Sequence, residues 1–199
     1  MILDGNKRWA KKNNFTNIYG YTKGFENINN IVKHSLSIGL PNLTIFTLSS
    51  ENFNRSSINI IYNIIYENFS KFFENLVREN GVKIKIFGSR ENLPEKIIEI
   101  FEESEKLSEN NNKLSLNIAF NYGFKNEIKK ILKSIKQNNL EINLEDETNL
   151  NKLFYLGSIP DPDILIRTGG YQRLSNFIMF NLTYTELFFT ETLWPDFTK

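Results

Sequence analysis

The fold is decided by residues 82–120, which read VKIKIFGSRENLPEKIIEIFEESEKLSENNNKLSLNIAF. Two short segments, Val82–Phe87 and Leu114–Phe120, read as strands, because their apolar residues recur at alternate positions. Between them, apolar side chains recur at helical spacing, and Pro94 stands where the first turn of a helix tolerates proline. A strand, a helix and a second strand in this order predict parallel strands that are covered by the connecting helix.

The same alternation extends on both sides of this unit, so we expect an α/β fold with a mainly parallel sheet flanked by helices. The prediction is a single domain over residues 1–199, with ligands at the carboxyl ends of the strands. The remaining expectations are helices over 25–36, 58–77 and 124–137, strands over 43–48 and 164–167, a turn at 121–123 and a polar surface segment over 138–148.

Composition and charge exclude several function classes. Among the 199 residues, 24 Lys and Arg stand against 23 Asp and Glu, and the net charge of +1 argues against a protein that wraps nucleic acid. Because cysteine is absent, disulfides, thiolate metal sites and cysteine nucleophiles are excluded, and the single histidine, His34, excludes a multi-histidine metal site. The sequence has neither a membrane-spanning apolar run nor an apolar signal core, so we expect an intracellular protein.

Two polar segments follow strand-like residues. Asp4–Trp9 comes directly after Ile2 and Leu3, and an acid followed by Gly-Asn at a helix start can present backbone N–H groups to an anion. An ordinary helix cap is the alternative there. Ser49–Arg55 follows the strand at 43–48 and gathers hydroxyl, carboxylate, amide and guanidinium groups, for which a solvated loop is the alternative.

A third polar segment, Arg167–Asn176, begins where the strand over 164–167 ends. Arg167 and Arg173 flank a double glycine, so the backbone can approach a phosphate or diphosphate closely while guanidinium groups bind it. Glu186 is an isolated acid among aromatic residues, and such an acid requires an arginine or a metal. Two anion sites and two separated acids together predict a Mg²⁺-assisted enzyme with two phosphorylated substrates.

Six blocks of sequence, in order along nearly the whole chain, resemble one family. The blocks are residues 4–10 (DGNKRWA), 49–52 (SSEN), 116–123 (LNIAFNYG), 161–170 (DPDILIRTGG), 173–177 (RLSNF) and 193–197 (LWPDF). Together they resemble the cis-prenyltransferases, whose bacterial members make undecaprenyl diphosphate.

The resemblance implies an activity. Enzymes of this family use Mg²⁺ to join isopentenyl diphosphate repeatedly to an allylic diphosphate, usually farnesyl diphosphate, and make a polyprenyl diphosphate with cis double bonds. It also implies a hydrophobic tunnel for the growing chain. The apolar helix over 58–77 is the expected wall, with a plain structural core as the alternative. Because family members usually dimerise and the product is a lipid, we expect a homodimer and peripheral membrane contact.

The resemblance further implies roles for individual residues. Asp4 would be the catalytic acid that holds Mg²⁺ against a diphosphate, Glu186 would complete the metal site, and Asn52 would assist proton removal. The residues expected to bind the allylic diphosphate are Gly5, Asn6, Lys7 and Arg8, with Trp9 beside them, and those expected to bind the diphosphate of isopentenyl diphosphate are Arg167, Arg173 and Ser175. The other expected substrate-binding residues are Asn17, Tyr21, Ser49, Ser50, Glu51, Phe53, Arg55 and Leu174.

Five positions depart from the family pattern. A histidine and an arginine of the family are Tyr21 and Asn17 here, which weakens the expected allylic site, while Lys7 replaces a glycine and adds a charge. Phe53 stands where tryptophan is usual, and Tyr171 where an acid is common. Most of a first strand and a final helix of the family are also missing from the chain as given. We therefore expect activity that is reduced or altered in product length.

Two other functions stay open from the sequence. A non-catalytic accessory subunit is motivated by these departures, although the retained acids and arginines speak against it. A nucleic-acid-binding module is suggested only by the lysines of residues 125–136, and the small net charge gives it little support. Cytoplasmic location is our expectation, and a longer natural N-terminus would leave organelle targeting open.

Overall fold

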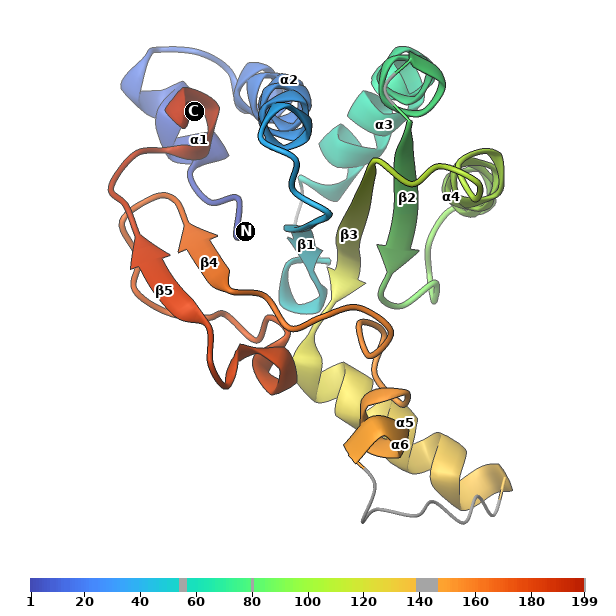
Figure 1. Ribbon diagram of the computed structural model, residues 1–199. Helices are drawn as coiled ribbons and strands as arrows, with labels where there is room; N and C mark the ends of the chain where they lie inside the picture. The colour runs from blue at the N-terminus through green and yellow to red at the C-terminus, as the bar shows by residue number, and fades with distance from the viewer. Residues whose placement is uncertain (54–56, 80, 139–146, 199) are drawn as a thin grey trace.

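The computed structural model describes residues 1–53, 57–79, 81–138 and 147–198 (Figure 1). Its strands pair in parallel, in the orders β2–β3–β1 and β4–β5. The α/β architecture expected from the sequence is confirmed, because each parallel pair requires a crossover connection. The strands are β1 Asn42–Ser49, β2 Val82–Phe87, β3 Leu114–Tyr122, β4 Ile164–Arg167 and β5 Glu186–Phe189.

Helices connect the strands and lie against the sheet. In Figure 1, α2, α3 and α4 lie beside the three-stranded part, and α5 and α6 extend away at the lower end. The helices are α1 Asn6–Lys12, α2 Asn17–Ser37, α3 Ile58–Phe73, α4 Glu95–Leu107, α5 Phe124–Asn138 and α6 Glu147–Asn151, with a π-helical turn at Glu74–Glu79 and 3₁₀ turns at Ser50–Asn52, Met179–Leu182 and Trp194–Asp196. Among the described residues, none of the helices combines the length and apolar character that crossing a membrane requires.

The first three residues join the two groups of strands into one sheet. Ile2 forms parallel bridges to Phe46 of β1 and Arg167 of β4. Its N–H donates to the carbonyl of Ile166 at 2.9 Å, and its carbonyl accepts from the N–H of Thr168 at 3.2 Å. The short N-terminal segment therefore supplies backbone partners to both neighbouring strands.

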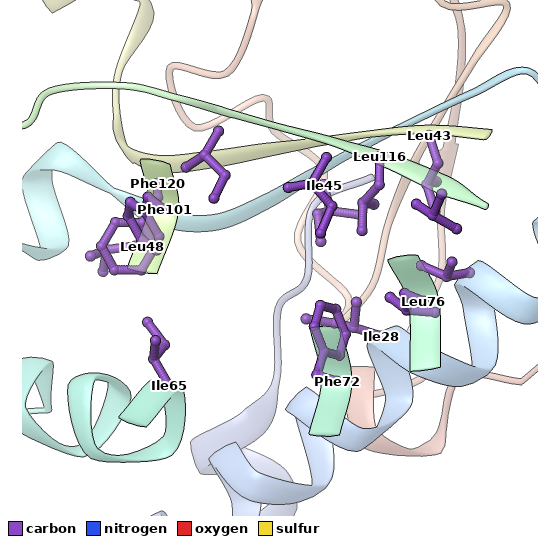
Figure 2. Close-up of a cluster of buried hydrophobic side chains, with 14 of the residues drawn as sticks. Ile28, Leu43, Ile45, Leu48, Ile65, Phe72, Leu76, Phe101, Leu116 and Phe120 are labelled. Atoms are coloured by element: carbon purple, nitrogen blue, oxygen red, sulfur yellow. The ribbon is translucent and has the colours of Figure 1, made fainter. Parts of the chain in front are cut away.

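Alternating side chains along the strands pack on both faces of the sheet. One cluster gathers apolar residues of β1, β2 and β3 against α2, α3 and α4. Figure 2 shows Ile45 and Leu116 of the strands opposite Ile28 and Phe72 of the helices. The second cluster includes Phe46, which stacks on Phe177 with ring centroids 4.6 Å apart. Because successive side chains of a strand point to opposite faces of the sheet, the strands contribute apolar residues to both clusters.

Most expected elements are confirmed, and three boundaries differ. The expected turn at 121–123 is wrong at its first two residues, because β3 continues through Tyr122, which pairs with Ser49. Helix α2 begins at Asn17 rather than near 25, because the Thr16 hydroxyl accepts from the Tyr19 N–H at 3.2 Å and caps it. The α-helix expected to Val77 ends at Phe73 and continues as the π-helical turn. Of the expected polar segment at 138–148, residues 139–146 lie outside the described residues.

Candidate active site

A polar cleft of about 700 Å³ opens where β1, β4 and the N-terminal segment end. Carboxyl ends of parallel strands meet at one edge of the sheet, and this brings together the three polar segments noted in the sequence. The expected site residues that line the cleft are Asp4, Gly5, Asn6, Lys7, Arg8, Tyr21, Ser49, Glu51, Asn52, Arg167, Arg173 and Ser175.

The Asp4 carboxylate lies between two guanidinium groups. Its Oδ1 is 3.1 Å from Nη2 of Arg8, and its Oδ2 is 2.9 Å from Nη2 of Arg167. The Thr168 hydroxyl accepts from the Asp4 N–H at 3.0 Å and donates to the Asp4 carbonyl at 2.9 Å. These contacts fix Asp4 at the base of the cleft, with its side chain 30% exposed toward solvent.

Arg167 is the most enclosed charge of the cleft, with its side chain only 3% exposed. Besides its contact with Asp4, its Nη1 donates to Ser175 Oγ at 2.6 Å and to the carbonyl of Arg173. Its Nε is buried without a hydrogen-bond partner. The rigid fork of arginine thereby fixes the loop after β4 against the segment that carries Asp4.

Tyr171, which the sequence did not assign to the site, is the centre of a group of cations. The guanidinium carbons of Arg8, Arg167 and Arg173 lie 4.7, 5.8 and 4.6 Å from the centroid of its ring. The negative face of an aromatic ring attracts such cations, so Tyr171 gathers three positive groups around one point of the cleft. In the sequence Tyr171 lies between Arg167 and Arg173, and this position is the signal that could have assigned it to the site.

The double glycine permits the close approach of this loop. A Cβ on Gly169 would lie 2.6 Å from Nη2 of Arg8 and 2.9 Å from the carbonyl oxygen of Asp4. Its φ of +87° also belongs to a region that side chains disfavour. The carbonyl of Gly169 accepts a hydrogen bond of 2.6 Å from Nη1 of Arg8. Glycine is required here for steric reasons.

The segment after β1 forms the opposite wall. Ser49, Glu51 and Asn52 line the cleft, and Oε1 of Glu51 accepts from Nδ2 of Asn176 at 2.7 Å. Asn176 also lines the cleft, although the sequence named it only as part of a motif. Ser50 and Phe53 are not part of the lining, and Arg55 lies outside the described residues.

An apolar pocket of about 110 Å³ adjoins the polar cleft. Its deeper walls come from α2, α3, α4 and the strands, in the cluster that Figure 2 shows. A cationic cleft that opens onto an apolar pocket suits a ligand with an anionic head and a hydrocarbon tail. The residues that line both cavities are Leu3, Asn6, Tyr21, Thr47 and Ile61.

Besides Ser50 and Phe53, four further expected site residues do not line the cleft. Trp9 donates from Nε1 to Oδ1 of Asp196 at 2.6 Å and stacks on a neighbouring ring. Asn17 lines a shallow groove that shares Lys7 and Arg8 with the cleft, and Leu174 packs against the second hydrophobic cluster. Glu186 begins β5, where it pairs with Ile164 at the start of β4. The structure thus does not bring Glu186 together with Asp4 in the cleft.

Sequence comparisons identify the family. Residues 2–199 match the family model described as "Putative undecaprenyl diphosphate synthase". An isoprenyl transferase of Thermotoga maritima is 40% identical, over 100% of this chain and 87% of the relative. A tritrans,polycis-undecaprenyl-diphosphate synthase (geranylgeranyl-diphosphate specific) of Pyrococcus furiosus is 37% identical, over 100% of this chain and 78% of its own length.

A solved structure agrees with these relatives. The crystal structure of lavandulyl diphosphate synthase from Lavandula x intermedia, in complex with dimethylallyl diphosphate, superposes with a TM-score of 0.90. The two proteins are 30% identical, and the match covers 100% of this chain and 88% of the other. The chain therefore belongs to the undecaprenyl diphosphate synthase family and is an enzyme of the cis-prenyltransferase type.

Proposed function

We propose that this prenyltransferase condenses isopentenyl diphosphate onto an allylic diphosphate, with farnesyl diphosphate as the expected acceptor, and makes a polyprenyl diphosphate with cis geometry. The observation that carries the proposal is the shared wall between the cationic cleft and the apolar pocket. Such a pair of cavities holds a diphosphate beside guanidinium groups while its hydrocarbon tail leaves water.

In this proposal the cleft binds two diphosphates. Gly5, Asn6, Lys7 and Arg8 bind that of the allylic substrate, and Arg167, Arg173 and Ser175 bind that of isopentenyl diphosphate. The allylic carbon–oxygen bond breaks, its electrons leave with the diphosphate, and the double bond of isopentenyl diphosphate forms the new carbon–carbon bond. A proton is then lost from the condensed product, with Asn52 assisting. Guanidinium groups stabilise the departing charge.

The donor set of the cleft fits Mg²⁺ if the substrate completes it. Among the described residues no group of three acidic or histidine side chains could hold a metal alone. Magnesium commonly uses one or two carboxylates together with substrate phosphates and water, and the partly exposed Asp4 carboxylate offers such a ligand. We propose Asp4 as that ligand; Glu186 begins β5 outside the cleft, so this chain alone does not bring it beside Asp4. A bound Mg²⁺ would stabilise charge on the leaving diphosphate.

Homodimer formation and membrane contact also belong to the proposal. The edge strand β5 exposes Leu187 and Phe188 to 46% and 49%, and the neighbouring Ile164 is 53% exposed. An apolar strand edge of this kind supports pairing with a second copy of the chain. We further propose a cytoplasmic enzyme in peripheral contact with a membrane, because its product would be a lipid.

The test is incorporation of labelled isopentenyl diphosphate onto dimethylallyl, geranyl, farnesyl and geranylgeranyl diphosphates, with Mg²⁺ or with EDTA. We expect Mg²⁺-dependent product, best with farnesyl diphosphate, whose new double bonds are cis by NMR. Product of trans geometry, or turnover that survives EDTA, would contradict the proposal. If the folded protein made no product alone but stimulated a separate prenyltransferase, the accessory-subunit function would replace it.

A further inference from the structure

The turn between α1 and α2 and the helix ends beside it carry exposed apolar side chains next to lysines. We propose that this surface, which we call the basic corner and define as Lys7, Lys11, Lys12, Phe15, Ile18 and Tyr19, docks the enzyme on an anionic lipid bilayer. The inference rests on the proposed function for its purpose, because a lipid diphosphate needs a membrane to enter. The binding itself requires no turnover.

Exposed apolar side chains gather at this corner. Residues 11–19 are all exposed, and within them Phe15, Ile18 and Tyr19 have exposed fractions of 50%, 58% and 40%. The rings of Phe15 and Tyr19 lie 4.5 Å apart, and Phe15 stacks on Trp9 at 5.7 Å. Single exposed apolar residues are ordinary, whereas a contiguous group of this kind marks a contact surface.

Positive charge surrounds these rings. Residues 5–25 contain five lysines and arginines and no acid, although the whole chain has a net charge of only +1. The remainder of the chain thus carries a net charge of −4. Arg8 pairs with Asp4 and Lys23 with Glu26, while Lys7, Lys11 and Lys12 form no ion pair with any residue that the structure describes. Three uncompensated lysines beside exposed rings complement an anionic surface.

The combination of rings and lysines favours a bilayer over other partners. Aromatic rings lie well at the boundary between hydrocarbon and headgroups, and lysine stems cross that boundary with the charge in the headgroup layer. Lysines near an anionic leaflet each add to the affinity. An RNA partner would also use the charge, but it offers no layer into which Ile18 could insert.

The corner is continuous with the active-site cleft. Lys7 and Arg8 line both the cleft and a shallow groove whose other walls include Lys11, Phe15 and Thr16. A bilayer in contact with the corner would therefore lie next to the mouth of the cleft. The corner thus provides an orientation in which an amphiphilic product leaves the protein directly into lipid.

A second basic surface, on α5, serves as a matched control. Lys129 and Lys133 are exposed there together with Leu132, which is 61% exposed. Figure 1 places α5 at the opposite end of the molecule from α1. The sequence that follows α5 holds four acids between residues 141 and 147, whereas the acid at the edge of the corner, Asp196, accepts a hydrogen bond from Trp9 Nε1.

The experiment is flotation of the purified protein with neutral phosphatidylcholine vesicles and with vesicles that also contain phosphatidylglycerol. The corner variants are Lys11→Gln/Lys12→Gln and Ile18→Gln, and the control is Lys129→Gln/Leu132→Gln/Lys133→Gln. We expect the wild type and the control to float with anionic vesicles only. The double lysine variant should lose roughly 30-fold in partition, and added salt should weaken binding of the wild type.

Equal flotation of the corner variants and the wild type would overturn the inference. Binding that fails in the α5 control instead, or that is equally strong on neutral vesicles, would also overturn it. Incorporation of labelled isopentenyl diphosphate is measured for the same proteins without vesicles and should be unchanged in the corner variants. An active wild type that binds no vesicle would refute the docking surface alone, whereas vesicle binding without turnover would refute the proposed function alone.

Discussion

Arg167 and Asp4 come from positions 163 residues apart, and their contact holds the cleft together. Arginine serves at position 167 because its fork reaches Asp4, Ser175 and a carbonyl at once. A lysine keeps the charge but has one ammonium group in place of the guanidinium fork, so partly buried acceptors would lose their donors.

Arg167→Lys should therefore lower the free energy of unfolding by about 1–3 kcal/mol. It should also raise the KM for isopentenyl diphosphate by at least roughly tenfold, because the loop that carries Ser175 loses its anchor. Urea unfolding and steady-state kinetics measure the two effects. The matched control is Arg173→Lys, whose exposed position predicts a stability change within about 0.5 kcal/mol. Equal stability losses in the two variants would contradict this account.

A second residue-scale prediction concerns Glu127, a buried acid in the first turn of α5. Its Oε2 accepts from the Tyr122 hydroxyl at 2.5 Å, and its Oε1 accepts from the Tyr155 N–H at 2.7 Å. Burial raises the pKa of Glu127 above its ordinary value of 4.5. A raised carboxyl pKa means that the folded state binds the proton more tightly, so its stabilising contribution is lost as pH rises.

The free energy of unfolding should therefore fall from pH 4.5 upward until the raised pKa of Glu127 is passed. Glu127→Gln has no proton to lose and should remove this part of the pH dependence. Urea titrations of both proteins over this range test it. A slope that is the same in both proteins would show that other groups cause the dependence.

Among the elements, the strands were predictable where their apolar pattern has clear ends. β2 and β4 have the expected bounds, because Val82–Phe87 alternates apolar residues with lysines up to Gly88 and Ile164–Arg167 is a short apolar run that ends before Gly169 and Gly170. The end of β3 was missed because Asn121 resembles a turn residue. In the fold its side chain donates to the carbonyl of Ser89 at 3.1 Å, a distant partner that no local pattern reveals.

Glu186 illustrates the limit of reading site residues without the topology. It was expected at the metal because it is an isolated acid, but it occupies the first position of β5. Since the cleft lies at the carboxyl ends of parallel strands, a residue at the start of a strand lies toward the opposite edge. A prediction of residues 186–189 as a strand parallel to β4 would have placed Glu186 outside the cleft.

The apolar pocket gives a prediction at the same scale. A cavity of roughly 150 Å³ holds benzene, so the pocket of about 110 Å³ is small for a growing hydrocarbon chain. Phe72 of α3 is 5% exposed, lines this pocket and lies 4.9 Å from the ring of Phe25. Phe72→Ala should therefore lengthen the products while destabilising the fold by about 3–5 kcal/mol.

Mass spectrometry of the products tests this expectation. The matched control is Phe87→Ala, which removes a buried ring from the opposite face of the sheet. It should destabilise the protein to a similar extent and leave product length unchanged. Identical product distributions in wild type and Phe72→Ala would exclude Phe72 as a determinant of length.

At the scale of the whole molecule, the C-terminal segment connects α2 to the N-terminal segment. Nδ2 of Asn27 donates to the carbonyls of Trp194 and Phe197, each at 2.8 Å, and Nε1 of Trp194 donates to the carbonyl of Gly24 at 2.7 Å. Trp194 N–H in turn donates to the carbonyl of Asp4 at 3.0 Å. The C-terminal segment therefore supports the backbone of Asp4.

Asn27→Leu should lower the free energy of unfolding by about 1–3 kcal/mol, because two buried carbonyls lose their donor. Because Trp194 contacts the Asp4 backbone, we also expect a lower kcat. Thermal unfolding and kinetics at saturating substrate measure these effects. Full activity in a destabilised Asn27→Leu protein would contradict the support that we assign to the C-terminal segment.

The family and its blocks could be predicted from the sequence, because each block is a local run of residues. The sequence alone could not show which side chains of these blocks come into contact in the folded protein. Tyr171 was noted only as a departure, yet its ring is near three guanidinium groups that come from two separate segments. Such a cluster exists only once the sheet has formed.

The central claim is that Asp4, held between Arg8 and Arg167, is required for transfer of the isoprenyl unit. The most direct test compares labelled isopentenyl diphosphate incorporation in wild type, Asp4→Asn and the control Glu102→Gln on α4, with farnesyl diphosphate and Mg²⁺. The account predicts a loss of at least roughly 100-fold in Asp4→Asn, at unchanged folding, and wild-type activity in the control. Turnover by Asp4→Asn at the wild-type rate would contradict it.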